Sequence, residues 1–276
     1  MGEVIVVDDH SVVSAADALR DIRDDRLHIH LNSRCSGASG SRNSGVDVAA
    51  GELIVFLDDD DLLLPGYIHW VREMVDRDSL VAYGFSAIKR FSGLTHDFPL
   101  LEFCVAQGVY LSDLPITKRL AGLGCGFWIR RALYLELGGL DETLSVNEDT
   151  DFTVSLIVRS VVGIYSPKIG VMVRTHASLS TGERASVTRS TSWLERAHNF
   201  ERIMRKHHSE LLARDQLRIF LLFRLVKMIA KTGQHADAMR VIGLWGGAQS
   251  LRYWIYYAAQ YMLGSLRAFA GHPWLA

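Results

Sequence analysis

The chain has 276 residues, 49% of them hydrophobic and 22% charged, which suits one large globular domain or one domain with a sizeable appendage. Its 30 Lys and Arg residues nearly balance its 31 Asp and Glu residues, so the net charge of −1 offers no general attraction for nucleic acid. Cys35, Cys104 and Cys125 fit neither a disulfide framework nor a zinc site, and these scattered thiols predict a reducing, cytoplasmic location.

The first part of the chain alternates between strand-like and helix-like segments, judged by the spacing of apolar residues. The predicted order is strand, helix, strand, small-residue loop, helix and strand, over residues 3–7, 14–24, 27–31, 32–41, 42–50 and 53–57. This rhythm is typical of a parallel, doubly wound α/β sheet.

The strand over 53–57 runs directly into four carboxylates, Asp58 to Asp61. Its five consecutive apolar residues predict burial on both faces, and ligands of open α/β sheets bind beyond the carboxyl ends of the strands. Because adjacent carboxylates repel one another, a hard divalent cation would compensate them. The alternative is an Asp-rich turn that caps a helix beginning near Pro65.

A second acidic site follows further along. The intervening segments predict a helix, strands, a weakly patterned loop, a strand and a short helix, over residues 65–76, 80–91, 92–120, 122–131 and 132–137. Asn147-Glu148-Asp149-Thr150-Asp151 then opens a predicted helix, and two short strands lie over 161–173. Acidic residues in a first helical turn are also expected from the helix dipole alone, so this alternative stays open.

From about Ser186 the pattern becomes nearly continuous helix and the charge changes. Between Arg189 and Lys231 ten basic residues oppose four acidic ones, and residues 253–257 are rich in Tyr and Trp. Basic, aromatic helices can lie on an anionic membrane surface, so peripheral membrane contact is one expectation. Packing on the first domain or on a second copy, as a homo-oligomer, is the alternative. We divide the chain into a domain over 1–182 and a helical region over 183–276.

Five ordered motifs resemble those of the family 2 glycosyltransferases. They are Val6-Val7-Asp8-Asp9-His10-Ser11, Ser41-Arg42-Asn43-Ser44-Gly45 with Ala50-Gly51-Glu52, Phe56-Leu57-Asp58-Asp59-Asp60-Asp61, Gly138-Gly139-Leu140-Asp141-Glu142 and Glu148-Asp149-Thr150-Asp151. The resemblance covers about residues 3 to 180. It implies a GT-A fold, which is Rossmann-like with a mostly parallel central sheet, and inverting transfer from a nucleotide-diphosphate sugar to an acceptor hydroxyl.

The resemblance implies a donor side. Asp9 would bind the nucleotide base, and Arg42 the diphosphate or the base, unless Arg42 forms only a surface salt bridge. Asp58 and Asp59 would reach the ribose. Asp60 would be the direct ligand of Mg²⁺ or Mn²⁺, which neutralises the charge that develops on the leaving diphosphate.

The resemblance also implies an acceptor side. Asp149 would be the base that takes the proton of the acceptor hydroxyl, with Glu148 beside it and Asp151 capping or pairing nearby. His176 would close on the diphosphate or metal, and Trp128 would stack on an acceptor sugar; for both, simple packing is the alternative. The acceptor itself would be a carbohydrate, a lipid-linked saccharide or a protein.

The start of the chain departs from the family pattern. Family members begin with another strand and helix, whereas Met1 directly precedes the segment that resembles their second strand. We expect a fragment or a misplaced start, because loss of an interior strand would expose sheet edges. The start also lacks a secretory signal. Rival functions are a nucleotidyltransferase and a non-catalytic sugar-nucleotide-binding or scaffold protein.

Overall fold

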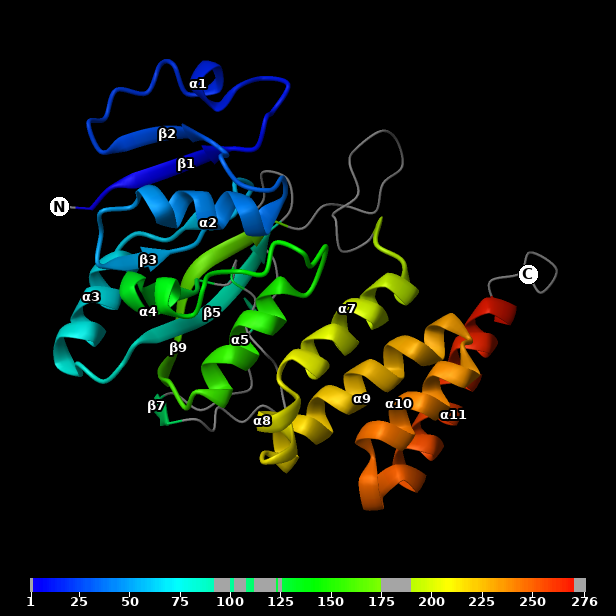
Figure 1. Cartoon of the computed structure of the whole chain (residues 1–276). Helices are drawn as coiled ribbons and strands as arrows, with labels where there is room; N and C mark the ends of the chain where they lie inside the picture. Colours follow the sequence, from blue (N-terminus) through cyan, green and yellow to red (C-terminus); the bar gives the residue numbers. More distant parts are fainter. Residues whose placement is uncertain are drawn as a thin grey trace. The chain divides into compact units, whose positions relative to one another are not determined.

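The computed structural model describes residues 2–91, 100–101, 108–111, 123, 126–174 and 190–270. The chain divides into two compact units, Met1–Gly182 and Glu183–Ala276, at the boundary drawn from the sequence. In Figure 1 the first unit contains strands and helices, and the second contains helices in its described part.

The first unit alternates strands and helices along the chain, as predicted. Its strands are β1 (Val4–Asp8), β2 (Leu27–Leu31), β3 (Leu53–Val55), β4 (Leu62–Leu63), β5 (Tyr83–Phe91), β6 (Leu100–Leu101), β7 (Gly108–Leu111), β8 (Trp128–Arg130) and β9 (Val162–Arg174). Its helices are α1 (Ala15–Ala18), α2 (Ala38–Val48), α3 (Tyr67–Arg77), α4 (Arg131–Glu136) and α5 (Glu148–Val158).

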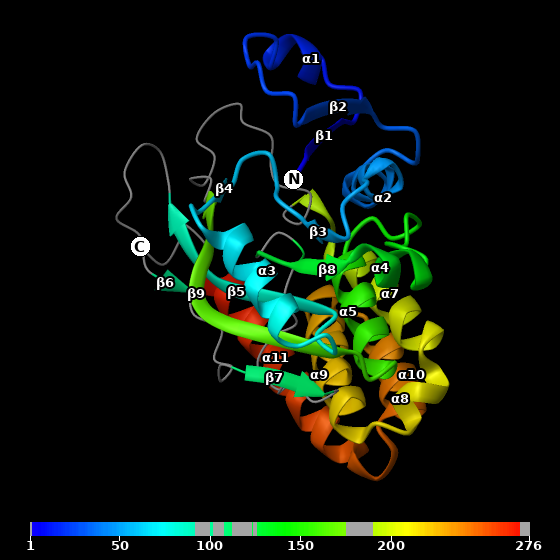
Figure 2. The same ribbon diagram turned by 90° about the vertical axis from the view of Figure 1, so that its left-hand side faces the viewer.

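The strands form two sheets of mixed direction. β1 and β2 pair in parallel by themselves, and the larger sheet has the order β3-β8-β5-β9-β4, with β6 on β5 and β7 on β9. Within the larger sheet only β5 and β9 pair in parallel. The α/β class is therefore confirmed, but a mostly parallel sheet is wrong. β3, β5 and β9 share one direction, and β8 inserts between β3 and β5 in the opposite direction (Figure 2).

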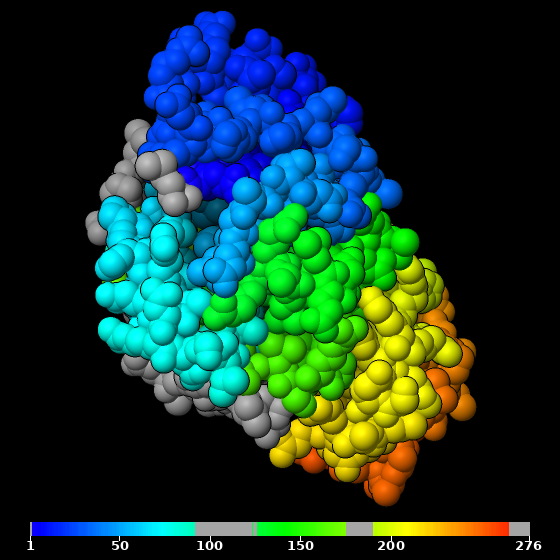
Figure 3. All heavy atoms as spheres, turned by 60° about the vertical axis from the view of Figure 1, so that its left-hand side comes forward, coloured from blue at the N-terminus to red at the C-terminus, as the bar shows by residue number. Residues whose placement is uncertain are grey.

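The prediction that the strand before the acidic cluster is buried on both faces is also wrong. β3 ends the strand order of its sheet, and its three side chains are half-buried. The start of β1 is nevertheless tied to the segment before β3, because Glu3 Oε1 accepts hydrogen bonds from the N–H groups of Ala50 and Gly51, both at 2.8 Å. Figure 3 shows the surface hollowed between the dark-blue N-terminal segment and the cyan segment that contains α3.

Apolar side chains cover both faces of the larger sheet. On one face Tyr67, Val71 and Val75 of α3 pack with Trp128 and Ile164. The other face packs against α2, α4 and α5 through a larger cluster that includes Val46, Phe85, Phe127, Ile129, Tyr134, Phe152, Leu156 and Tyr165. Neighbouring residues of one strand thus enter different cores, as the alternation of side chains along a strand requires.

The second unit contains α7 (Trp193–Lys206), α8 (His208–Leu212), α9 (Asp215–Thr232), α10 (His235–Trp245), the short 3-10 helix η1 (Gly247–Gln249) and α11 (Ser250–Ala270). The long α9 is central, since α7, α8, α10 and α11 all pack against it. Across the described residues, we find no helix both long and apolar enough to cross a bilayer.

Candidate active site

Two carboxylates at the end of the first strand, Asp8 and Asp9, have different hydrogen-bond partners. Asp8 is buried and accepts hydrogen bonds from the backbone N–H groups of Ser11 and Ala15, each at 2.8 Å. These bonds, that from Ala15 first, hold the pKa of Asp8 below its ordinary value. Asp8 therefore fixes the turn that leads into α1.

Asp9 joins the ends of the two parallel strands. It accepts from the Asn32 side-chain amide at 2.6 Å and from the Gly37 N–H at 2.7 Å, so it organises the loop after β2. Partial burial acts to raise the pKa of Asp9, but the hydrogen bonds, chiefly that from Asn32, outweigh it and lower the pKa. The carboxylate is only half-buried and can accept further bonds. Its role in binding a nucleotide base stays a prediction.

Glu142 fastens the same loop to the segment that follows α4. It accepts from the Arg34 guanidinium at 3.0 Å, the Cys35 N–H at 3.2 Å and the Asn43 amide at 2.7 Å. Burial opposes ionisation, yet these bonds, led by that from Asn43, lower the pKa of Glu142 to about 2. Arg34 also forms a two-pronged pair with Asp47 of α2.

Asn43 anchors α2 to the turn that contains the two adjacent glycines. Its side chain donates to the Leu140 carbonyl and accepts from the Leu140 N–H, both at 2.9 Å, and accepts from the Tyr134 hydroxyl at 2.6 Å. Gly139 has a φ of +72°, and a Cβ there would lie 2.5 Å from the Asn43 side-chain oxygen. This close approach explains why a glycine occupies position 139.

The acidic loop after β3 is held by the last strand of the sheet. β4 pairs with β9 directly after the loop, and the buried Asp61 accepts from the Arg174 N–H at 2.8 Å. The Arg174 guanidinium donates to the Asp60 carbonyl at 3.0 Å. Burial, followed by the negative charges of Asp58 and Asp60, raises the pKa of Asp61 to about 6.

The alternative in which these aspartates cap the next helix is wrong. α3 begins at Tyr67, and its N-cap is Gly66 with a φ of +81° and no side-chain capping bond. Asp61 is held instead by β9, so the loop is fixed by the sheet and not by the helix.

Arg42 of α2 brings the two acidic sites together. Its guanidinium contacts Asp58 at 2.7 Å and Glu148 at 3.4 Å, so the segment after β3 and the start of α5 share the guanidinium of Arg42. Burial acts to lower the pKa of Arg42, but the charges of Asp58, Glu148 and Asp149 outweigh it and raise the pKa. Arg42 is therefore an ion-pair centre and more than a surface salt bridge.

The start of α5 presents two neighbouring carboxylates. Burial, and then the charge of Asp149, raises the pKa of Glu148. Asp149 is half-buried and accepts from the Thr150 N–H at 2.6 Å. Before them Asn147 has a φ of +68°, and its buried amide nitrogen has no hydrogen-bond partner among the described residues. A non-Gly residue in this conformation is uncommon and marks this turn as a candidate contact for a ligand.

The remaining predicted site residues differ in their placement. Asp59 is exposed beside the Asp58 and Asp60 positions, whereas Asp151 is buried in the first turn of α5, and its capping or pairing role stays a prediction. Trp128 is fully buried against α3, and a Cβ at Gly84 would lie 2.7 Å from its ring. Stacking of Trp128 on an acceptor sugar is therefore wrong, and packing is its role. His176 lies outside the described residues.

Three residues that shape the site were not singled out from the sequence: Asn43, Glu142 and Asn147. The first two lie inside motifs quoted above, but each stands beside other polar residues, so no local signal distinguishes them. Asn147 is the first residue of the second acidic site, and asparagine is one of the few residues that tolerates a positive φ.

Oxygen ligands suitable for Mg²⁺ or Mn²⁺ are present in the acidic loop, but they do not form a complete protein cage. Among the residues whose positions are described, no three His, Cys, Asp or Glu side chains converge as metal ligands. Mg²⁺ commonly takes one or two carboxylates and completes its shell with water and substrate phosphates. The Asp58 to Asp60 loop therefore fits a cation that arrives with a diphosphate.

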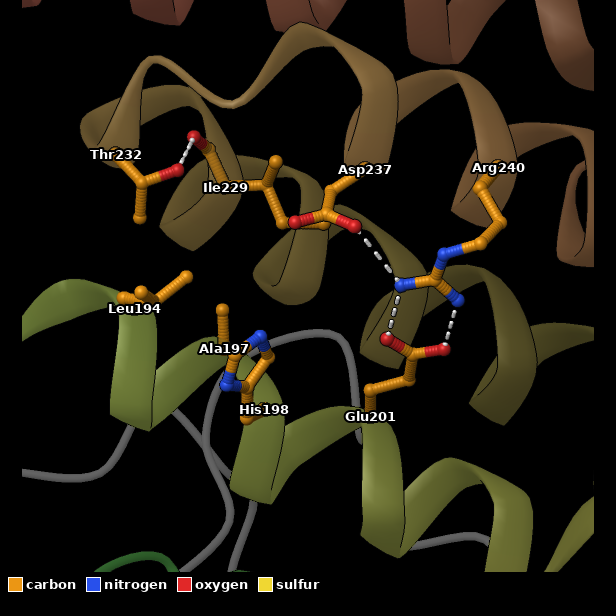
Figure 4. A pocket seen from close by; sticks show the side chains of 8 residues that line it. All are labelled: Leu194, Ala197, His198, Glu201, Ile229, Thr232, Asp237 and Arg240. Carbon is orange, nitrogen blue, oxygen red and sulfur yellow. Dashed lines mark hydrogen bonds and ion pairs between the residues drawn. The ribbon is translucent and has the colours of Figure 1, made fainter.

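A pocket in the helical unit lies between α7, α9 and α10 (Figure 4). One of its charged residues, Glu201, is buried and forms ion pairs with Arg240 and Arg205. These guanidiniums, chiefly that of Arg240, lower the pKa of Glu201, although burial acts to raise it. Because the charge of the Glu201 carboxylate is already neutralised by these arginines, we interpret the pocket as the place of an interhelical ion-pair network.

Comparison with known proteins identifies a family. The description "Glycosyl transferase family 2" matches residues 2–138. The chain is 32% identical over 99 residues to the GalNAc(5)-diNAcBac-PP-undecaprenol beta-1,3-glucosyltransferase of Campylobacter jejuni, covering 35% of this chain and 32% of that protein. It is 41% identical over 59 residues to the UDP-Glc:alpha-D-GlcNAc-diphosphoundecaprenol beta-1,3-glucosyltransferase WfaP of Escherichia coli, covering 21% and 24%. The match thus spans under a third of each relative's length.

Solved structures share the fold. TarS residues 1–349 of S. aureus, in complex with UDP, superpose with a TM-score of 0.60 at 16% identity, covering 98% of this chain and 82% of that one. The complex of the same protein with UDP-GlcNAc has a TM-score of 0.53 at 18% identity and covers 95% and 80%. The predicted GT-A type of fold is confirmed by this likeness, and the chain belongs to glycosyl transferase family 2.

Proposed function

We propose that the chain transfers a sugar from a UDP-sugar to a hydroxyl group of a lipid-linked saccharide, with inversion at the anomeric carbon. The observation that carries the proposal is the pair of contacts made by Arg42, which joins Asp58 of the acidic loop after β3 to Glu148 at the start of α5. The relatives support the substrates, since both glucosyltransferases are named for an undecaprenol diphosphate acceptor, and TarS has been solved with UDP and with UDP-GlcNAc.

On the donor side, Asp9 would accept from the imide N–H of the uracil, and Asp58 and Asp59 would bind the ribose. Arg42 would turn part of its guanidinium toward the diphosphate, because a planar fork suits phosphate oxygens. Asp60 would hold Mg²⁺ or Mn²⁺ with the diphosphate, and the cation would stabilise the charge of the leaving UDP. His176 remains a proposed ligand of the cation or the diphosphate.

On the acceptor side, Asp149 would remove the proton from the attacking hydroxyl. The hydroxyl oxygen then forms a bond to the anomeric carbon as the bond from that carbon to the UDP oxygen breaks, and the single in-line displacement inverts the centre. Glu148 supports this step by its pairing with Arg42, which places positive charge beside the two carboxylates. No covalent sugar intermediate is needed.

The test measures UDP release from UDP-glucose in the presence of Mn²⁺ and a polyprenyl-diphosphate-linked GlcNAc acceptor. We expect Asp149→Asn to slow transfer roughly 10²–10⁴-fold, the usual contribution of a general base, while UDP binding measured by calorimetry changes less than about twofold. Asp76→Asn, on an exposed part of α3, is the matched control and should transfer at the wild-type rate.

Full turnover by Asp149→Asn would refute the base assignment alone. Failure of the wild-type chain both to bind UDP and to release it from any UDP-sugar with acceptor would refute the proposed function. A lipid-linked acceptor implies that the enzyme works at the cytoplasmic membrane surface, which we include in the proposal.

A further inference from the structure

The last helix carries an apolar stripe that faces away from the rest of its unit. Leu251, Ile255, Ala258 and Met262 of α11 follow one another at spacings of four, three and four residues, which places them on one side of a helix. All four are exposed, Leu251 to 73%, Ile255 to 64% and Met262 to 59%. A solvent-facing helix side normally carries polar or charged residues, and over residues 251–264, where the side chains of α11 are described, this side carries none.

The opposite side of α11 is fixed by packing. Tyr253 and Tyr257 are buried, and the Tyr253 and Tyr256 rings lie 4.8 Å and 4.9 Å from the ring of Phe223 on α9. The rotation of α11 about its axis is therefore set by this aromatic contact. The apolar stripe is the outward side of a well-packed helix and not a core side that lacks its cover.

Side chains suited to a polar–apolar boundary flank the stripe. Trp254 and Tyr261 lie on one flank at helical spacing, and the exposed Arg252 lies on the other, with its guanidinium 5.7 Å from the Phe223 ring. Trp and Tyr place an apolar ring beside a polar tip, and Arg keeps its charge in water while its stem covers apolar surface. This arrangement is typical of helices that lie in a membrane interface.

The helical unit carries a net positive charge, which an anionic membrane surface would attract. Residues 183–276 contain 14 Lys and Arg against six Asp and Glu, a net charge of +8, whereas residues 1–182 contain 16 against 25, a net charge of −9. Lys and Arg near an anionic bilayer each add to the attraction. The apolar stripe and the positive charge thus belong to the same unit.

A second copy of the chain fits the stripe less well. Two copies joined through the same stripe would bring two units of +8 together. The stripe runs along roughly 16 Å of helix at 1.5 Å per residue, a small patch beside the roughly 800 Å² that each partner of a stable complex buries. A bilayer needs no such area, because each apolar side chain that enters it adds to binding separately.

We propose that the stripe of α11 docks on the surface of a lipid bilayer with anionic headgroups, with α11 lying in the interface plane. This deepens the proposed function, since it supplies the surface on which a lipid-linked acceptor would be met. It is tested without donor or acceptor, so its failure and that of sugar transfer are distinguishable.

The test is cosedimentation of the full chain with vesicles of phosphatidylcholine containing phosphatidylglycerol, and with vesicles of phosphatidylcholine alone. We expect binding to the mixed vesicles that weakens in high salt, and much weaker binding to the neutral ones. Leu251→Glu and Ile255→Glu should each lower the partition coefficient about tenfold or more, because a carboxylate replaces an inserting apolar group. Leu80→Glu is the matched control, since Leu80 is 71% exposed on the other unit.

Unchanged circular dichroism and unfolding midpoint will show that the variants fold, as expected at exposed positions. Three results would overturn the proposal: no vesicle binding by the wild-type chain, equal binding by Leu251→Glu, Ile255→Glu and wild type, or an oligomer in light scattering that these two variants dissociate. The last outcome would assign the stripe to a second copy of the chain.

Discussion

Arg42 lies among carboxylates that would repel one another without it, and this position decides the effect of replacing it. Its fork reaches Asp58 and Glu148 at the same time. Lysine keeps the charge but offers a single point donor on a flexible stem, so it cannot hold both partners in one geometry. Asp58 and Glu148 would then no longer be joined by one guanidinium.

We therefore expect Arg42→Lys to weaken UDP binding and to lower kcat/KM for transfer, together by roughly tenfold to a hundredfold, as for loss of a charge-assisted hydrogen bond. Calorimetry with UDP and initial rates check this. Arg20→Lys, at a largely exposed position, is the control and should behave as wild type. An Arg42→Lys variant with wild-type affinity and rate would remove Arg42 from the donor site.

Asp61 links the site to the pH dependence of stability. Its pKa is raised to about 6 in the folded chain, first by burial, against 3.8 for an ordinary aspartate. The folded state therefore binds this proton more tightly than the unfolded state, and the stability that this gives is complete below pH 4 and is lost as the pH rises to about 6. Above that range Asp61 carries a buried, repelled charge.

Asp61→Asn should abolish this loss, because the amide oxygen still accepts from the Arg174 N–H. We expect the variant to exceed wild type by on the order of 2 kcal/mol in unfolding free energy at pH 7.5, and to match it near pH 4. Urea unfolding at the two pH values measures the difference. An equal difference at both would show that ionisation of Asp61 is not its cause.

At the scale of elements, α2 serves two neighbours through consecutive residues. Arg42 points to the acidic site, and Asn43, one position on, points to the turn after α4. Successive helical residues differ by about 100° in direction, so one short helix can position both. The register of α2 is therefore locked by Asn43 and used by Arg42.

This arrangement predicts that Asn43→Ala costs about 2–4 kcal/mol of unfolding free energy, because the N–H and C=O of Leu140 are left buried without partners. Tyr134→Phe removes only the hydroxyl that donates to Asn43 and should cost about 1 kcal/mol. Urea denaturation compares the two variants with wild type. If Asn43→Ala were no worse than Tyr134→Phe, the anchor at Leu140 would be refuted.

Local pattern predicted elements well where a core reinforces it and poorly elsewhere. The predicted helix over 65–76 forms as α3, which buries Tyr67, Val71 and Val75, but the predicted helix over 14–24 forms only as α1, which buries no residue. The two strands expected around Pro167 form one strand, β9, whose pairing with β5 shifts register there. The direction of β8 depends on which strands it joins, and no local signal contains that information.

At the scale of the molecule, the sequence predicted the division into units from a change in pattern and charge, and the two compact units have that boundary. The acidic motifs predicted the carboxylates of the candidate site that act on Arg42, namely Asp58, Glu148 and Asp149. The sequence could not predict the hydrogen bonds between distant segments, such as that of Asn43 with Leu140. Those bonds depend on tertiary packing, which also decided that Trp128 is core and not binding surface.

The opposite charges of the two units have a further consequence. A net charge of −1 conceals −9 on residues 1–182 and +8 on residues 183–276, so each unit carries a strong charge of its own. An anionic surface therefore attracts the basic unit and repels the acidic unit before any contact forms. Salt limits both forces to separations of about 10 Å at 0.1 M ionic strength. The proposed donor site thus belongs to the unit that such a surface repels, and its nucleotide sugar would arrive from the aqueous phase.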